Sequence, residues 1–376
     1  MDTTVKPPKV DPPQPAEDQD DLDEMPRVHV TRRGLVLFGL FLVSVIAFLY
    51  FVLPQLADLE DTGKRVGEGD RWWLAGAFVF TVLSFGGYVM MFQGVFVRAG
   101  SRIDWRASYQ ITMAGLAATR LFAAGGAGGI ALTAWALRRA GMPRRTVADK
   151  TLAFLILTYA VYMGALVVVG FGLYLGLLPG PAPFAITVIP ALFGLAVIVL
   201  GLALARVPPD LQRRLEGFAS RGGRFARLAQ RAANAPAAVS AGMREALCHV
   251  RERDPALLGA VAYWAFNIAV LWACFHAFGD PPPWPVMVMA YFVGFLGNLL
   301  PLPGGIGGVD GAMFGAFAAF GVPLSLAVPA VLAYRGFAFW LPTIPGAIAY
   351  FQLRRTVARW REERGSHSDL PAAAGA

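Results

Sequence analysis

The sequence predicts an all-α integral membrane protein with about six spanning helices and two glycine-tipped re-entrant hairpins, arranged as an inverted repeat. Three observations lead to this fold class. Of the 376 residues, 56% are hydrophobic and 15% are charged, whereas soluble domains have about 25% charged residues. Several apolar runs are long enough to cross a bilayer. A glycine cluster occurs twice, each time inside an apolar segment.

Residues 1–33 precede the first apolar run and are rich in Pro, Asp and Glu. Such a segment buries too little apolar surface to fold, so we expect a disordered cytoplasmic tail. The first apolar run begins late and is long, which favours a retained helix over a cleaved signal. The membrane domain is expected over 34–350, followed by a second cytoplasmic tail over 351–376.

A spanning helix needs about 20 apolar residues. Six stretches meet this length, and two further apolar segments, 107–141 and 285–322, are interrupted near the middle by glycines. The six predicted spans are 34–53, 72–97, 150–178, 184–205, 255–279 and 324–350.

The two interrupted segments resemble each other. Each glycine cluster is followed by a short apolar stretch and then a Gly-x-Pro turn, at 141–143 and 321–323. We therefore expect one repeat over about 107–178 and a second over about 285–350, with a binding site where the broken helices point. The predicted hairpin tips are Gly125, Gly126, Gly128 and Gly129, and Gly304, Gly305, Gly307 and Gly308.

Glycine suits a hairpin tip because non-helical backbone at membrane depth must be buried in protein or line a cavity. Glycine allows a tight reversal and a close approach by a neighbour. The alternative interpretation is that these glycines only let helices pack closely.

Basic residues predict the orientation, since short cytoplasmic loops are rich in Lys and Arg. The first hairpin is flanked by basic residues at both ends, so its mouth is predicted inside. No Lys or Arg occurs from Pro255 to Tyr334, so the second mouth is predicted outside and both termini inside. The inside clusters are Arg27, Arg32 and Arg33; Arg98, Arg102 and Arg106; Arg138, Arg139, Arg144, Arg145 and Lys150; and Arg354, Arg355, Arg359 and Arg361.

Four ionisable residues fall within or beside the apolar segments: Arg120, Lys150, Asp310 and Arg335. A charge at the bilayer centre costs at least about 2.5 kcal/mol, so it is a default sign of function. In the functional interpretation the cations bind a lipid phosphate and Asp310 balances them. In the alternative, Asp310 and Arg335 form a structural pair while Arg120 and Lys150 reach the headgroups. Residues 148–154 also resemble residues 333–339, and this similarity aligns Lys150 with Arg335. Asn298 and Tyr334, with Thr119 and Tyr159, are candidate polar contacts or ordinary interhelical hydrogen bonds.

The segment 206–254 contains ten arginines and five acidic residues and is predicted to be a cytoplasmic loop. Part of it is amphipathic, which is typical of a helix on an anionic leaflet. Nucleic acid is not an expected partner, because the arginines lack interleaved aromatic residues. The loop is also a candidate docking surface for a partner enzyme.

Enzyme chemistry has little support in the residue pattern. The four histidines are scattered, and Cys248 and Cys274 have neither metal-ligand spacing nor an expected disulfide. We expect no metal and no cofactor.

The second half of the chain carries a more specific pattern. It consists of Pro303-Gly304-Gly305-Ile306-Gly307, Asp310, Gly321-Val322-Pro323, Tyr334-Arg335, Phe339-Trp340-Leu341-Pro342 and Gly346. This pattern resembles the membrane domain of lysylphosphatidylglycerol synthases, a family that includes stand-alone flippase-like members, over roughly residues 34–355. Where the family usually has Arg-Glu, this chain has Val309-Asp310.

The resemblance implies a domain that moves a charged lipid between leaflets, without the soluble domain that performs aminoacyl transfer. We therefore expect a translocase or lipid-binding protein of the bacterial cytoplasmic membrane, whose ligand is a phospholipid or another amphiphilic lipid. The alternatives are a membrane scaffold for a lipid- or glycan-modifying enzyme and a membrane enzyme.

Overall fold

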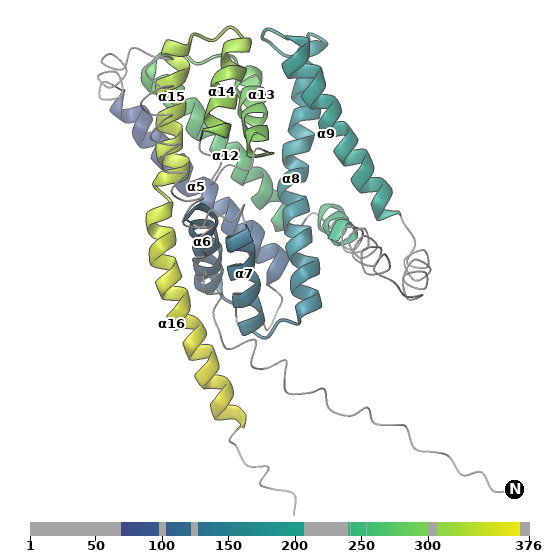
Figure 1. Ribbon diagram of the computed structural model, residues 1–376, viewed down its shortest axis with the longest axis vertical. Helices are drawn as coiled ribbons and strands as arrows, with labels where there is room; N and C mark the ends of the chain where they lie inside the picture. The colour runs from purple at the N-terminus through teal and green to yellow at the C-terminus, as the bar shows by residue number, and fades with distance from the viewer. Residues whose placement is uncertain are drawn as a thin grey trace, which may run out of the picture.

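The computed structural model describes residues 69–97, 103–121, 127–206, 240, 242–252, 254–299 and 307–368, and their regular structure is helical. Five helical segments are long and apolar enough to span a membrane (Figure 1). They are α5 (Arg71–Phe96), α8 (Arg144–Tyr174), α9 (Phe184–Ala205), α12 (Pro255–Phe278) and the continuous segment Leu324–Trp360. The predicted span 34–53 lies outside the described residues.

Helices α5 and α12 begin at capped positions close to the predicted boundaries. Asp70 accepts a hydrogen bond from the Trp72 amide (2.8 Å), and Asp254 accepts one from Ala256 (2.8 Å). Pro255 occupies the first turn of α12, where its missing N–H has no cost. These caps explain why the apolar pattern located both starts within a residue or two.

Helices α5 and α12 pack closely against each other. A Cβ atom on Gly259 would lie 2.5 Å from the Met91 amide nitrogen, and one on Gly87 would lie 2.9 Å from the Tyr263 amide nitrogen. Small residues let membrane helices approach in this way. A hydrogen bond also joins the two helices: the Ser84 hydroxyl donates to the Tyr263 carbonyl (2.9 Å).

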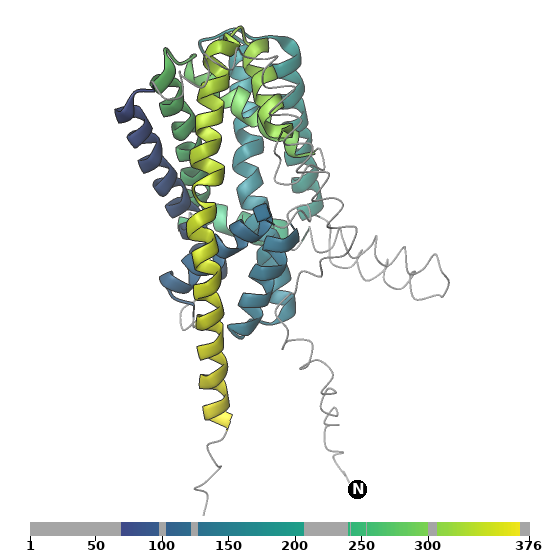
Figure 2. The same ribbon diagram turned by 60° about the vertical axis from the view of Figure 1, so that its left-hand side comes forward.

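Two short-helix hairpins enter the bundle from opposite ends. Helices α6 (Trp105–Leu121) and α7 (Ala127–Arg139) occupy the lower half in Figures 1 and 2. Helix α13 (Trp284–Phe295), the 3-10 turn η2 (Leu296–Leu299) and α14 (Gly308–Ala319) occupy the upper half. Helices α7 and α14 have 13 and 12 residues, which is too short to cross a bilayer.

The mouths of the two hairpins have matching turns. Gly141 (φ +98°) and Gly321 (φ +80°) both adopt the left-handed conformation that glycine favours. The Gly141 amide donates to the Arg138 carbonyl and the Gly321 amide to the Ala318 carbonyl, both at 2.9 Å. The predicted Gly-x-Pro turns therefore have the same backbone geometry at opposite ends of the molecule.

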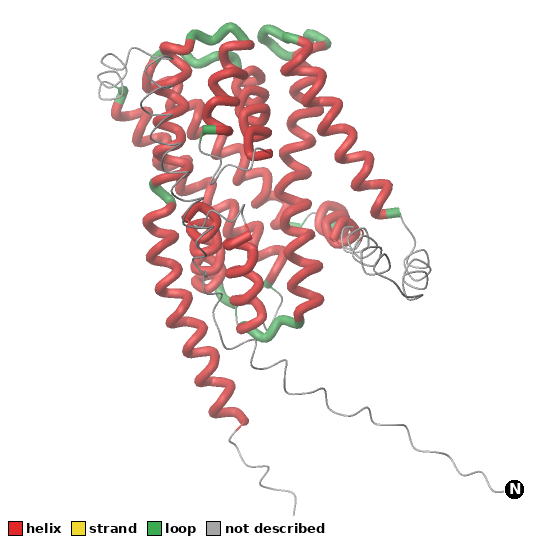
Figure 3. Tube along the Cα trace, in the orientation of Figure 1, coloured by secondary structure: helices red, strands yellow, loops and turns green. Residues whose placement is uncertain are grey.

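The helices that follow the two turns differ. Helix α8 runs unbroken for 31 residues. Its counterpart consists of α15 (Leu324–Arg335), a π-helical turn η4 (Gly336–Trp340) and α16 (Thr343–Ser368) (Figure 3). The Leu341 amide donates to the Gly336 carbonyl (2.9 Å), which is the wide bond of a π turn, and such turns mark breaks in helices.

The end of the predicted last span at residue 350 differs from the structure. Helix α16 continues to Ser368, and Leu353, Val357 and Trp360 are buried in the apolar cluster that also contains residues of α6. The segment 351–360 therefore packs on the first hairpin. The predicted pattern ended early because polar residues alternate with this apolar stripe.

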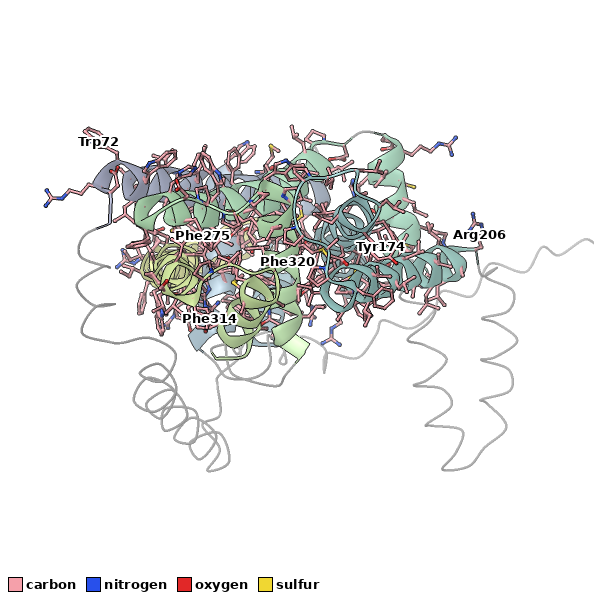
Figure 4. The ribbon with its side chains drawn as sticks, turned by 90° about the horizontal axis from the view of Figure 1, so that it is seen from above. Trp72, Tyr174, Arg206, Phe275, Phe314 and Phe320 are labelled. Atoms are coloured by element: carbon pink, nitrogen blue, oxygen red, sulfur yellow. The ribbon has the colours of Figure 1, made fainter. Side chains whose placement is uncertain are left out.

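Buried apolar side chains form two clusters, one for each hairpin. The first gathers around α13, α14 and α15, and the second around α6, α7 and the lower part of α16. Viewed from the upper end (Figure 4), Phe275 and Phe314 lie inside the bundle while Trp72 projects from its edge. The inner ends of both hairpins thus lie between the two clusters.

Candidate functional site

A buried ion pair joins the second hairpin to the broken helix. Arg335 ends α15, and its Nε lies 2.6 Å from Oδ1 of Asp310, in the first turn of α14. The Asp310 Oδ2 also accepts a hydrogen bond from the Gly307 amide (2.9 Å), which caps α14. Asp310 therefore has two functions, as the counter-charge of Arg335 and as a helix cap.

Arg120 reaches the same region from the first hairpin, in the last turn of α6. Its guanidinium donates to the Ala338 carbonyl (2.9 Å), the Thr343 hydroxyl (3.4 Å) and the Phe339 carbonyl. All three acceptors lie at the junction of η4 and α16, midway along the yellow helix in Figure 2.

Pro342 explains why one of these carbonyls is free. In an α-helix the Ala338 carbonyl would accept from residue 342, but proline has no N–H. Arg120 supplies the missing donor. The break in the helix at Pro342 therefore provides the carbonyl that positions Arg120.

Phe339 brings the two guanidinium groups together. Its ring centroid lies 4.8 Å from Cζ of Arg120 and 4.6 Å from Cζ of Arg335. Both contacts are within cation–π range, and the two cations are within about 10 Å of each other. A second ring, Phe85 of α5, lies 5.9 Å from Cζ of Arg120.

The three charged groups leave a net positive charge. Asp310 pairs with Arg335, whereas the hydrogen-bond acceptors of Arg120 are all neutral among the residues that the structure describes. A cation away from water without a counter-charge is costly. The inner ends of the two hairpins therefore favour an anionic group beside Arg120.

Lys150 lies apart from this cluster. Its ammonium donates to the Val95 carbonyl, one of the last carbonyls of α5, which lack partners within their own helix. A cation at this position also suits the helix C-terminus.

The matched turns place Lys150 differently from the similarity between residues 148–154 and 333–339. Lys150 comes seven residues after Pro143, whereas Arg335 comes twelve after Pro323. These spacings correspond to about 10 and 18 Å along the helices. Lys150 is thus nearer its hairpin mouth than Arg335 is to the corresponding turn.

The remaining polar candidates are also separate from the three charges. The Tyr334 hydroxyl donates to the Tyr291 hydroxyl (3.1 Å), on the side facing α13. Asn298 is exposed in η2. The Thr119 hydroxyl donates to the Gly115 carbonyl within α6 (3.0 Å), and Tyr159 is half exposed. Among the described residues, no side-chain hydrogen bond joins any of them to Arg120 or Arg335, although Tyr334 directly precedes Arg335 in the chain.

The glycines near the tips have two different roles. A Cβ on Gly129 would lie 2.4 Å from the Gly115 carbonyl oxygen, so Gly129 holds the arms of the first hairpin together. In the second hairpin, a Cβ on Gly297 would likewise lie 2.4 Å from the Gly308 carbonyl oxygen. Gly307 has φ +81° and is the N-cap residue of α14. Gly128 lies in the first turn of α7. Gly125, Gly126, Gly304 and Gly305 lie outside the described residues.

Sequence reasoning found the three charges but missed the groups that position them. Phe339 was noted only as part of the second-half pattern and was given no role. Phe85 and Thr343 were not singled out, because isolated aromatic and hydroxyl residues in apolar helices are common. Pro342, which follows Phe339-Trp340-Leu341 within an apolar helix, was the available signal. The predicted docking loop 206–254 falls largely outside the described residues. Among the described side chains, no group of three His, Cys, Asp or Glu residues is placed to hold a metal.

The apolar spans, the two short-helix hairpins that enter from opposite ends, and the cations Arg120 and Arg335 on either side of Phe339 define a polytopic helical membrane protein with re-entrant hairpins. The chain belongs to the family described as the lysylphosphatidylglycerol synthase TM region, whose model matches residues 36–346.

Two curated relatives are UPF0104 membrane proteins of the archaeon Methanothermobacter thermautotrophicus. One is 35% identical over 91 residues, which cover 24% of this chain and 26% of the relative. The other is 36% identical over 86 residues, covering 23% of this chain and 26% of the relative. The chain thus matches about a quarter of the length of each.

Proposed function

We propose that this protein moves an anionic or phosphate-bearing lipid between the leaflets of the bacterial cytoplasmic membrane. The observation that carries the proposal is the guanidinium of Arg120, which lies within 5 Å of the same phenyl ring as Arg335 and donates only to neutral acceptors among the described residues. A lipid phosphate would supply the missing negative charge.

Arginine suits this task because its planar guanidinium binds phosphate oxygens with two parallel hydrogen bonds and stays charged in an apolar setting. Arg335 is held by Asp310, with Nε to Oδ1 at 2.6 Å and Nη2 to Oδ2 at 3.5 Å. In our proposal the phosphate binds at Arg120 and competes with Asp310 for Arg335. Because the phosphate would exchange Arg120 and Arg335 as partners, it could pass between the hairpins while its negative charge stays paired with an arginine.

The hairpin arrangement supports movement rather than binding alone. The hairpins enter from opposite ends, and their inner ends lie next to Arg120 and Asp310 (Figure 1). Transporters with inverted repeats place the substrate between broken helices near the bilayer midplane. Tilting of either hairpin would open the charged cluster to one leaflet at a time.

The Arg-rich end of the molecule is assigned to the cytoplasm in this proposal. The mouth of the first hairpin and the lower part of α16 carry the arginines, whereas the loops 175–183 and 279–283 carry one charged residue, Asp280. Positive residues favour the cytoplasmic side.

The test is lipid movement in proteoliposomes of phosphatidylcholine that contain a fluorescently tagged phosphatidylglycerol, followed by dithionite quenching. Arg120→Gln should slow movement about tenfold or more, because a hydrogen bond to a charged group contributes about 1.5–3 kcal/mol. The glutamine amide still donates to a carbonyl, so the fold should survive. Arg335→Ala should abolish movement.

Arg354→Gln is the matched control, since Arg354 is exposed on α16. Because Arg335→Ala leaves Asp310 without a partner, the Asp310→Asn/Arg335→Gln variant is measured beside it. Wild-type rates in folded Arg120→Gln protein would refute the phosphate role of Arg120. Lipid binding by wild-type protein without any movement would indicate an accessory protein instead.

A further inference from the structure

A polar groove with a volume of about 650 Å³ lies between the start of α6 and the lower part of α16. Its lining includes three arginines, Arg106, Arg355 and Arg359, against one carboxylate, Asp104. Asp104 caps α6 by accepting from the Ala107 amide (2.7 Å). None of the three arginines forms an ion pair with a carboxylate among the described residues, so the groove is positively charged.

The wall of this groove is held in place by hydrogen bonds between the two helices. The Thr356 hydroxyl donates to Oε1 of Gln110 (2.8 Å), and Nη2 of Arg359 donates to the Thr356 hydroxyl (3.2 Å). Thr356 is 9% exposed. Arg359 therefore has a defined position on the α16 side.

An apolar groove of about 670 Å³ adjoins the polar one. It runs between α5, α6 and the junction of η4 with α16, and its lining includes Phe78, Phe85, Met113, Leu341 and Ile344. Phe85 is the ring that also contacts Arg120 at 5.9 Å. The far end of the apolar groove thus lies beside the charged cluster.

The two grooves share Trp105 and Tyr109 as lining residues. These side chains are 60% and 40% exposed, and such residues are typical of the membrane interface, where one end is apolar and the other is hydrated. A cationic groove that continues into an apolar one at an aromatic boundary matches the shape of an amphiphile with an anionic head.

We infer that the two grooves together bind one anionic phospholipid of the leaflet at the Arg-rich end. Its phosphate lies among Arg106, Arg355 and Arg359, and its acyl chains lie along the apolar groove. A soluble phosphate compound would use only the polar half, so the continuity of the grooves selects a lipid.

The distances fit this occupant. From Trp105 to Arg120, α6 rises about 22 Å, whereas one leaflet contributes about 15 Å of hydrocarbon. A lipid seated in the grooves thus has its head at the interface and its chains extending toward Arg120. A role for these grooves in supplying lipid to Arg120 rests on the proposed function, whereas lipid binding in the grooves does not.

Crosslinking inside a nanodisc tests the inference. p-Benzoylphenylalanine replaces Tyr109 at the shared wall, and the protein is placed in nanodiscs of equal phosphatidylcholine and phosphatidylglycerol. Mass spectrometry then identifies the crosslinked lipids. We expect phosphatidylglycerol to exceed phosphatidylcholine several-fold, and Arg355→Gln/Arg359→Gln to return the ratio to that of the bulk. Arg354→Gln is the matched control and should keep the enrichment.

Three outcomes would overturn the inference: no enrichment, enrichment that survives the double variant, or loss of the crosslink to excess soluble glycerol phosphate. Arg120→Gln separates it from the proposed function. That variant should keep the crosslink while it slows lipid movement. Enrichment without any lipid movement by wild-type protein would defeat the translocase proposal alone.

Discussion

The hydrogen-bond and ion-pair partners of Arg120, Asp310 and Arg335 determine whether each charge is neutralised. Asp310 pairs with Arg335 and caps α14 through the Gly307 amide. Arg120 is bound to carbonyls, one of them freed by Pro342. Neutral partners orient Arg120 without cancelling its charge, whereas the carboxylate of Asp310 largely cancels that of Arg335. An incoming anion should therefore bind first at Arg120.

The two roles of Asp310 can be separated by substitution. Asp310→Asn keeps an oxygen for the Gly307 amide but leaves Arg335 buried without its counter-charge, a loss of about 3–5 kcal/mol. Asp310→Ala also removes the cap, at a further cost of about 1 kcal/mol. We expect the thermal midpoint in detergent to fall for Asp310→Asn and further for Asp310→Ala.

The double variant Asp310→Asn/Arg335→Gln completes this experiment. It removes both charges, so its midpoint should be above that of Asp310→Asn. Equal midpoints for the single and double variants would show that Arg335 without its counter-charge costs no stability, which would contradict the burial argument.

At the scale of elements, close contact between the arms keeps each hairpin narrow. In the first hairpin Gly129 of α7 meets Gly115 and Thr119 of α6, and in the second Gly297 of η2 meets Gly308 of α14. The interpretation of the glycines as packing residues therefore holds for these positions. It coexists with a conformational role at Gly307, whose φ is +81°.

Gly129→Ala tests the packing role. The new Cβ would lie 2.0 Å from the Thr119 hydroxyl oxygen and 2.4 Å from the Gly115 carbonyl oxygen. The arms must then separate, which costs about 1–3 kcal/mol. The thermal midpoint should fall, and lipid movement should slow because α6 carries Arg120.

Gly311→Ala is the matched control on the other hairpin, since nothing lies within 4 Å of the place that its new methyl group would take on α14. Alanine favours a helix over glycine by about 1 kcal/mol, so this midpoint should stay level or rise. A fall as large as that of Gly129→Ala would show that any added methyl group is harmful, whatever the local space.

At the scale of the whole molecule, apolar length and glycine spacing predicted most of the architecture. The spans 72–97, 184–205 and 255–279 agree with α5, α9 and α12 to within a residue or two, since burial in lipid requires an apolar run with capped ends. The charges Arg120, Asp310 and Arg335 were also predictable, because lipid makes each of them costly.

Other features of the fold and the site depend on tertiary contacts, which a local sequence pattern does not predict. The π turn at Gly336–Trp340 and the placement of Arg120 on its carbonyls require α6 and α16 to meet. The extension of α16 beyond residue 350 is stabilised by packing of Leu353, Val357 and Trp360 on the first hairpin. The contact of Lys150 with the Val95 carbonyl likewise requires α8 and α5 to meet.

The orientation of the whole molecule gives the last prediction. Leu177, in the loop between α8 and α9, is 76% exposed at one end, and Ala358 is exposed on α16 near the other. In a background with Cys248→Ser and Cys274→Ala, each position is changed to cysteine and intact cells are treated with a membrane-impermeant maleimide. The positive-inside rule predicts that Leu177→Cys is labelled in intact cells and Ala358→Cys only after permeabilisation. The reverse labelling pattern would show that the orientation is the opposite one. The groove of Arg355 and Arg359 would then lie in the outer leaflet, and the lipid would enter from that side.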